Sequence, residues 1–220
     1  MTIPEKPLPR LKANYKVQIK NLMDEDMMKK QSTLFPENEV KVIAELDLKE
    51  AERLACQFKA VVEAQCDRIE VAGSIRRQKT KVHDIDFVVV TKNDAGWQKI
   101  SEKLKHLKAK PNCSGNSVIK AFLPCQNGLF QVDFYRAKPS TFGIHLLVRT
   151  GSADHNMWLA GYAISKGMRI RYSEGLIKEG RVFAGETEKG VFGALGLPYP
   201  LPPEREIVDS KPVWMSPQKP

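Results

Sequence analysis

Two aspartates, Asp84 and Asp86, open an apolar and β-branched run that continues to Val90. Side chains two residues apart in a strand point to the same face, so these carboxylates converge on one point in space. Such a pair is typical of a site for a hard divalent cation, which prefers oxygen ligands. A solvated strand edge explains an isolated Asp-x-Asp equally well, so the pair needs support from other residues.

A Gly-Ser turn and two arginines come just before this pair. Gly73 permits a close backbone approach to an anion, Ser74 offers a hydroxyl, and Arg77 offers a planar guanidinium fork that matches phosphate oxygens. A nucleoside triphosphate requires this combination of groups, although each is also common in ordinary turns. We therefore predict a nucleotide-binding turn at Gly73, Ser74 and Arg77.

A third carboxylate, Asp133, lies in a later strand-like run over residues 129–135. If this strand is an antiparallel neighbour of the first, Asp133 faces the other two carboxylates. Three such ligands suit two Mg²⁺ ions, for which Mn²⁺ can substitute, and two ions about 3.5–4 Å apart promote in-line phosphoryl displacement. Our candidate catalytic and metal-binding residues are therefore Asp84, Asp86 and Asp133.

The composition points to a polyanionic partner. The 220 residues include 35 Lys plus Arg and 26 Asp plus Glu, which gives a formal charge of +9. Nucleic acid fits this excess better than a membrane, since no long apolar span or basic amphipathic helix is present, and a merely basic surface remains the plainer alternative. The four cysteines form no zinc-like pattern, so we expect free thiols, a cytoplasmic location and, without an apolar heptad, a monomer.

Hydrophobic spacing predicts the elements that position these residues. Helical periodicity follows a capping-box-like start at Asp47 and recurs over residues 96–108. Strands are predicted at 69–72, 85–91, 118–123 and 129–135, the last two joined at an Asn-Gly turn. Farther along, a turn at Gly151 leads into a helix that reaches Gly167, and then come a small sheet and a Pro-rich, extended end. We expect an α+β fold with a mixed or antiparallel sheet.

The ordered set of motifs resembles the family X DNA polymerases. It consists of Gly73-Ser74, Asp84-Ile85-Asp86, Val132-Asp133-Phe134, and Thr150-Gly151-Ser152 with Asn156. The resemblance covers residues 45–206, and its Gly-Ser and Asp-x-Asp part is shared with the wider nucleotidyltransferase superfamily. It implies a nucleotidyltransferase palm with helices on one face of its sheet at residues 46–140, and a small α+β nucleotide-selecting subdomain that resembles thumb or fingers at residues 141–206. From their composition, residues 1–45 are expected to form a basic N-terminal extension and residues 207–220 a Pro-rich tail.

The resemblance also implies residue roles. The three aspartates would hold magnesium, with Asp133 helping the primer 3′-hydroxyl to attack, and the Gly73 to Arg77 turn would hold the β- and γ-phosphates. Gly151 and Ser152 would line the sugar pocket, and Asn156 would contact the minor-groove edge of the incoming base. Two plainer alternatives stay open: Ser152 caps the following helix, and Asn156 lies on the solvent face of that helix.

Four departures from the family pattern limit the prediction. Val148-Arg149 replaces an aromatic pair that restricts room for a 2′-hydroxyl, and Ala160 replaces a template-contacting arginine. His83 stands where a small residue is usual, and we expect it to fill space rather than to reach the triphosphate. The first 45 residues are too short for the family's lyase domain, so lyase activity is not predicted.

We expect a magnesium-dependent, template-directed DNA polymerase that fills short gaps in DNA repair and uses nucleoside triphosphates. A nucleotidyltransferase that needs no template or uses another acceptor is the alternative enzyme, and a DNA-binding protein on a retired fold is the non-enzymatic one. Candidate contacts to the DNA backbone are basic residues near the N-terminus and in the C-terminal part: Lys12, Lys16, Lys20, Lys166, Arg169 and Arg171.

Overall fold

The structure is a computed structural model that describes residues 45–107, 110–125, 128–208 and 211–215. These residues lie within one compact unit. One large hydrophobic core is built from residues between Ala51 and Phe134, and a second from residues between Ile144 and Leu197. No described helix is long and apolar enough to cross a membrane.

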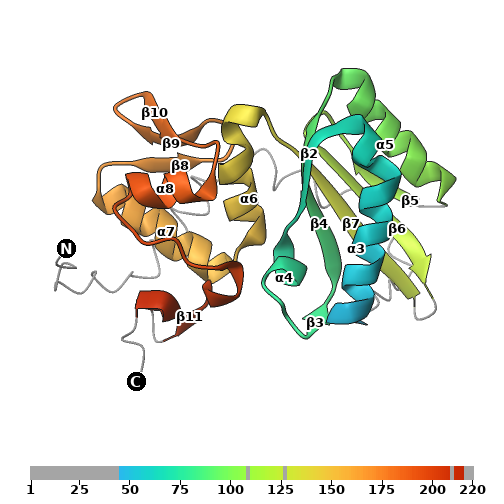
Figure 1. Cartoon of the computed structure of the whole chain (residues 1–220), viewed down its shortest axis with the longest axis horizontal. Helices are drawn as coiled ribbons and strands as arrows, with labels where there is room; N and C mark the ends of the chain where they lie inside the picture. The colour runs from blue at the N-terminus through green and yellow to red at the C-terminus, as the bar shows by residue number, and fades with distance from the viewer. Residues whose placement is uncertain (1–44, 108–109, 126–127, 209–210, 216–220) are drawn as a thin grey trace, which may run out of the picture. The chain divides into compact units, whose positions relative to one another are not determined.

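The first core is organised by a five-stranded sheet in the order β2-β4-β7-β6-β5 (Figure 1). β4 runs antiparallel to β2 and parallel to β7, and β7, β6 and β5 are antiparallel neighbours, so the sheet is mixed, as expected. The strand bounds are β2 Cys66–Val71, β4 Asp84–Thr91, β5 Lys110–Ser114, β6 Val118–Cys125 and β7 Gly128–Arg136.

The expected antiparallel pairing of the two aspartate-bearing strands is wrong. β4 and β7 are indeed neighbours, but they run parallel, with Asp86 in register with Asp133. The helix α5 (Asp94–His106) and the strands β5 and β6 lie between them in sequence. This long connection returns the chain to the end of the sheet at which β4 begins. A parallel neighbour of β4 must start at that same end.

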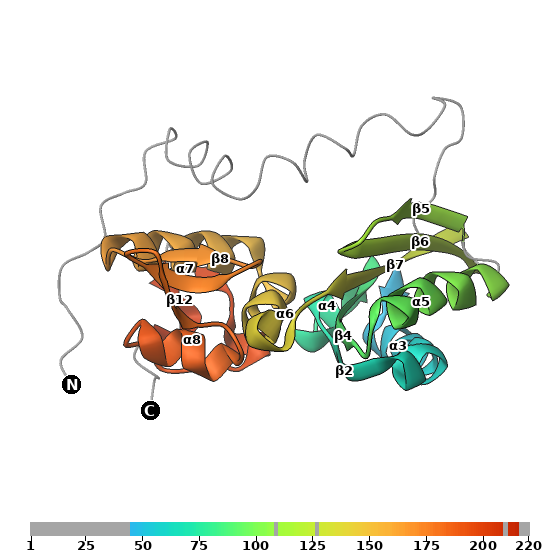
Figure 2. The ribbon, with the colours of Figure 1, turned by 90° about the horizontal axis from the view of Figure 1, so that it is seen from above.

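Two helices cover one face of this sheet, as Figure 2 shows for α3 (Leu48–Val62) and α5. The predicted cap at Asp47 is present, because its Oδ1 accepts a hydrogen bond from the Glu50 amide at 2.9 Å. The apolar sides of both helices pack against Phe87 and Phe134, whose rings stack 4.8 Å apart. Alternate residues of β4 and β7 therefore face the other side of the sheet.

The link between β2 and β4 contains two short elements. It begins with one helical turn, α4 (Gly73–Arg76), which leads to β3 (Lys81–Val82). β3 pairs with β1 (Leu46–Asp47) rather than with the central sheet.

The second core is formed by helices around a small antiparallel sheet, β10-β9-β8. The helix and strands after the Gly151 turn are as predicted, whereas α6, α8 and β5 were not. α6 is buried nearly all round, so its sequence has no polar stripe that would reveal a helical period. The bounds are α6 Phe142–Thr150, α7 Ala153–Ser165, β8 Arg169–Arg171, β9 Gly175–Lys178, β10 Arg181–Ala184 and α8 Glu188–Ala194.

The Pro-rich end is only partly extended. β11 (Ile207–Val208) pairs with β12 (Lys211–Pro212), and the following Trp214 ring packs edge-on against Trp158 and Phe192. These contacts attach the end of the described chain to the second core.

Candidate active site

The three aspartates lie together on the sheet face that α3 and α5 leave uncovered. Asp84 and Asp86 open β4, and Asp133 is the partner of Asp86 on β7. Because the next pair in register, Phe87 and Phe134, stacks on the helix side, Asp86 and Asp133 point to the opposite side. Asp133 is 1 % exposed, and the other two are partly buried.

The surroundings of the cluster disfavour the ionised forms of Asp84 and Asp86. Burial, with the charges of Asp84 and Asp133 added, raises the pKa of Asp86 to about 8. Burial and the charge of Asp133 likewise raise the pKa of Asp84. Among the described residues, no side chain donates a hydrogen bond to either carboxylate. A divalent cation is the kind of ligand that relieves such a charge.

Asp133, by contrast, has three donors, none of which the sequence analysis assigned a role. Its Oδ2 accepts from Lys120 Nζ at 2.5 Å and from the Tyr135 hydroxyl at 2.8 Å, and its Oδ1 accepts from Gln131 Nε2 at 2.9 Å. Lys120 lies opposite Asp133 on β6. As the one charge in the apolar run 118–123, it offered a signal that the sequence analysis did not use.

In the described part of the chain, no three His, Cys, Asp or Glu side chains are already arranged to hold one metal ion. Both oxygens of Asp133 accept hydrogen bonds, which come from Lys120, Gln131 and Tyr135. The donor set itself, three carboxylates on two neighbouring strands, fits the oxygen preference of magnesium. The residues therefore suit the ion, but Asp133 must first exchange partners.

The Gly73-Ser74 turn abuts this cluster. Gly73 has φ +61°, and a Cβ built on it would lie 2.2 Å from Asp86 Oδ2, so glycine leaves the space that this carboxylate occupies. The Ser74 hydroxyl is buried without a hydrogen-bond partner among the described residues. A buried hydroxyl without a partner is costly, so Ser74 is suited to bind an incoming oxygen.

Arg77, the predicted phosphate ligand, is already engaged. Its Nη1 donates to the carbonyl of Thr150, and its Nε lies 3.6 Å from Glu206 Oε1. Lys79 Nζ lies 2.7 Å from the same Glu206 oxygen. Glu206 thus faces two of the cations near the turn, a position that nothing in the sequence pattern indicated.

The three residues predicted around the sugar and base lie at the start of α7. Gly151 (φ +71°) ends α6, and the Gly151–Ser152 peptide bond is cis. Ser152 does cap α7, since its Oγ accepts from the His155 amide at 3.3 Å. Asn156 is not on the solvent face: its Nδ2 donates to the Val148 carbonyl at 2.7 Å and so ties α7 to α6.

Two of the departures from the family pattern have clear positions. The Arg149 guanidinium lies over the Tyr135 ring, 3.7 Å from its centroid, beside the aspartate cluster. His83 is 63 % exposed, with its Nε2 3.6 Å from Glu45, so the expectation that it fills space is wrong.

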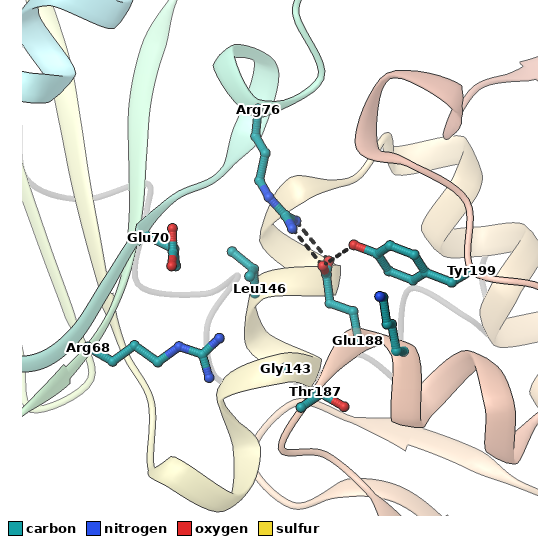
Figure 3. Close-up of a pocket in the computed structure, with 9 residues that line it drawn as sticks. Arg68, Glu70, Arg76, Gly143, Leu146, Thr187, Glu188 and Tyr199 are labelled. Carbon is teal, nitrogen blue, oxygen red and sulfur yellow. Dashed lines mark hydrogen bonds and ion pairs between the residues drawn. The ribbon is translucent and has the colours of Figure 1, made fainter.

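A buried ionic network joins α4 to the second core. Glu188, at the start of α8, accepts hydrogen bonds from Arg76, Arg205 and the Tyr199 hydroxyl, and Figure 3 shows Arg76 and Tyr199 directed at its carboxylate. Burial alone would raise the pKa of Glu188, but its hydrogen bonds to Arg76 and Arg205 outweigh that effect and lower it to about 2. The network forms part of a pocket of about 260 Å³, whose described lining includes none of the three aspartates.

The candidate DNA contacts divide into two groups. Lys12, Lys16 and Lys20 lie outside the described residues. Lys166, Arg169 and Arg171 are exposed, and Arg171 pairs with Glu174 at 3.1 Å. Exposure leaves this second group accessible to a phosphate backbone.

Comparisons with known proteins find similarity to DNA polymerases. The family model for the DNA polymerase beta thumb matches residues 145–206. The DNA polymerase/3′-5′ exonuclease PolX of Bacillus subtilis (strain 168) is 29% identical over 134 residues, covering 60% of this chain and 23% of that protein. DNA polymerase lambda of Rattus norvegicus is 40% identical over 163 residues, covering 61% of this chain and 28% of that protein.

The fold has a solved counterpart. A crystal structure of Leishmania infantum polymerase beta in a ternary P/T complex superposes with a TM-score of 0.65 at 20% identity, covering 74% of this chain and 77% of that one. The chain spans about a quarter of the length of the curated relatives it matches. The α+β fold class and the resemblance to the family X DNA polymerases are confirmed.

Proposed function

We propose that this chain, a relative of the family X DNA polymerases, is a magnesium-dependent and template-directed DNA polymerase. It adds a nucleotide from a nucleoside triphosphate to a primer 3′-hydroxyl and acts, as a monomer, on short gaps in DNA repair. The observation that carries this proposal is the aspartate cluster, with Asp86 and Asp133 in register and Asp84 on the same face, beside the unpartnered Ser74 hydroxyl.

The chemistry is a phosphoryl transfer. The primer 3′-oxygen attacks the α-phosphorus, the bond to the oxygen that bridges to the β-phosphate breaks, and pyrophosphate leaves. Asp133 accepts the proton of the 3′-hydroxyl. Magnesium held by Asp84, Asp86 and Asp133 would supply positive charge beside the attacking and leaving oxygens.

The remaining roles belong to the turn and to the second core. Ser74 and Arg77 hold the β- and γ-phosphates. Gly73 has no Cβ, so the turn can lie close to the Asp86 carboxylate. Gly151, Ser152 and Asn156, at the junction of α6 and α7, position the sugar and base. We keep the division into an extension, palm, nucleotide-selecting subdomain and tail, at residues 1–45, 46–140, 141–206 and 207–220, as part of this proposal.

The test is primer extension on a one-nucleotide gapped duplex with Mg²⁺ and the four deoxynucleoside triphosphates. We expect one templated addition that is lost when the divalent ion is chelated. A control lacks the template strand. Failure of the 220-residue chain to add a nucleotide with either Mg²⁺ or Mn²⁺ would refute the proposal.

A second candidate is nucleotidyl transfer without a template. It is favoured by two departures near the nascent base pair, Arg149 in place of an aromatic residue and Ala160 in place of a template-contacting arginine. Equal addition with and without the template strand would select this candidate over the first.

A further inference from the structure

Lys120 is a charged residue at the centre of the candidate active site that no motif of the chain accounts for. Its ammonium lies 2.5 Å from Asp133 Oδ2, and its side chain is 20 % exposed. It reaches Asp133 from β6, where the two residues are direct neighbours in the ladder. Asp86, Asp133 and Lys120 thus form one row across three adjacent strands.

The three aspartates differ in their positively charged partners. Asp133 has a direct cationic partner, whereas the carboxylates of Asp84 and Asp86 have no side-chain hydrogen-bond donor among the described residues. Lys120, together with Gln131 and Tyr135, fixes both oxygens of Asp133. It also occupies Asp133 Oδ2, an oxygen that a metal ion held by the three aspartates would need.

We propose that Lys120 is a positioning residue that holds the Asp133 carboxylate in place and occupies it until a divalent ion binds. This inference rests on the proposed function. A lysine suits the role because its ammonium is a compact charge on a flexible stem, which can withdraw by rotation about its side-chain bonds while Asp133 stays in the row.

Two consequences distinguish this role from simple packing. A cation beside Asp133 repels a second cation, so removal of the Lys120 charge should tighten the binding of a divalent ion to the cluster. Removal also releases Asp133, so the chemical step should slow. Binding of the triphosphate should not change, because the hydrogen bond and ion pair of Lys120 are made to Asp133, whereas Ser74 and Arg77 would hold the phosphates.

The test compares the wild-type chain with Lys120→Met and Lys120→Arg. Mn²⁺ alone, without nucleotide or DNA, is titrated into each protein at one pH, and free Mn²⁺ is followed by electron paramagnetic resonance. We expect Lys120→Met to bind Mn²⁺ about fivefold or more tightly than wild type, and Lys120→Arg to bind like wild type. Thermal melting of each variant establishes that it is folded.

The matched control is Lys103→Met. Lys103 lies in α5 on the opposite face of the sheet and donates to the Val61 carbonyl at 2.7 Å. Its replacement measures the effect of losing a partly buried, hydrogen-bonded lysine away from the aspartates. Its Mn²⁺ affinity should equal that of wild type. Equal Mn²⁺ affinity of wild type and Lys120→Met, whether measurable or undetectable, would overturn the proposal.

Steady-state primer extension supplies the second readout. For Lys120→Met we expect kcat to fall about tenfold while the KM for the nucleotide stays within about twofold, and we expect Lys120→Arg to recover most of kcat. An unchanged kcat in Lys120→Met would also overturn the proposal. A wild-type chain that extends no primer refutes the polymerase function but leaves the Mn²⁺ comparison intact as a test of Lys120.

Discussion

Glu206 is a single residue that already pairs with two cations of the candidate phosphate site. Its carboxylate lies 2.7 Å from Lys79 Nζ and 3.6 Å from Arg77 Nε, and it is about one-third exposed. In the proposed polymerase, the γ-phosphate of an incoming nucleotide would bind beside the same cations. Glu206 would then compete with the triphosphate for them.

We predict that Glu206→Gln lowers the KM for the nucleotide about three- to tenfold, which corresponds to roughly 1 kcal/mol for a partly exposed ion pair, without changing kcat. Steady-state extension at several nucleotide concentrations measures both constants. Glu174→Gln, which removes an exposed partner of Arg171, is the matched control. A KM that does not move would show that Glu206 leaves Arg77 and Lys79 free to bind.

His155 links stability to pH. It has no exposed surface, and neither ring nitrogen has a hydrogen-bond partner among the described residues. Burial, with the nearby charge of Arg205, lowers its pKa from 6.5 to about 4. Since the unfolded chain then binds this proton more readily than the folded one, the contribution is fully present above pH 6.5 and is lost as the pH falls through about 4.

The expected contribution of His155 across this window is about 2–3 kcal/mol. Urea unfolding at pH 4.5 and pH 7 should give a smaller stability difference for His155→Leu than for wild type. His106→Leu, at an exposed position, should leave the difference unchanged. An equal difference in wild type and His155→Leu would mean that the buried ring does not resist protonation.

At the scale of elements, two glycines in neighbouring helices predict opposite effects of the same substitution. A Cβ at Gly143 in α6 would lie 2.3 Å from the backbone of Thr187, directly before α8. A Cβ at Gly161 in α7 would meet nothing within 4 Å. The first glycine permits close packing of two elements, and the second only weakens its own helix.

Gly143→Ala should lower the free energy of unfolding by about 1–3 kcal/mol through overpacking. Gly161→Ala should raise it by roughly 0.5–1 kcal/mol, because alanine favours the helix. Denaturant unfolding of both variants measures these changes. The packing of α6 against Thr187 would be disproved if Gly143→Ala proved as stable as wild type.

The elements also show where sequence reasoning succeeds and where it fails. α3 and α5 were predictable because each has one buried and one solvated face, and the Asp84 and Asp86 pair was predictable because strand periodicity is local. α6 has no polar face, and the parallel pairing of β4 with β7 depends on a long connection, so neither can be read from local spacing. The contacts of Lys120 and Glu206 are tertiary: the single charge in the apolar run 118–123 marks Lys120 without revealing its partner, and no pattern marks Glu206.

At the scale of the whole molecule, the charge of +9 argues for binding to the phosphate backbone of DNA. Lys166, Arg169 and Arg171 are exposed and lie at the end of α7 and in β8. Their replacement by Gln should reduce the slope of log affinity against log salt concentration by about 1 for each phosphate that the protein no longer neutralises.

Fluorescence anisotropy of a labelled gapped duplex, over a series of salt concentrations, measures this slope. The matched control replaces three exposed lysines on the helix-covered side of the sheet: Lys49, Lys99 and Lys105. If the control set changes the slope as much as the first set, DNA binding depends only on the total charge of the protein. Lys166, Arg169 and Arg171 would then not be specific contacts to DNA.

The proposed polymerase depends on the aspartate cluster for nucleotidyl transfer. Single-turnover incorporation on gapped DNA with Mg²⁺, in wild type and in Asp133→Asn, tests this dependence most directly, with nucleotide binding measured in parallel. The account predicts that Asp133→Asn loses at least about three orders of magnitude in the rate of the chemical step and still binds the nucleotide through Ser74 and Arg77. Incorporation by Asp133→Asn at the wild-type rate would contradict it.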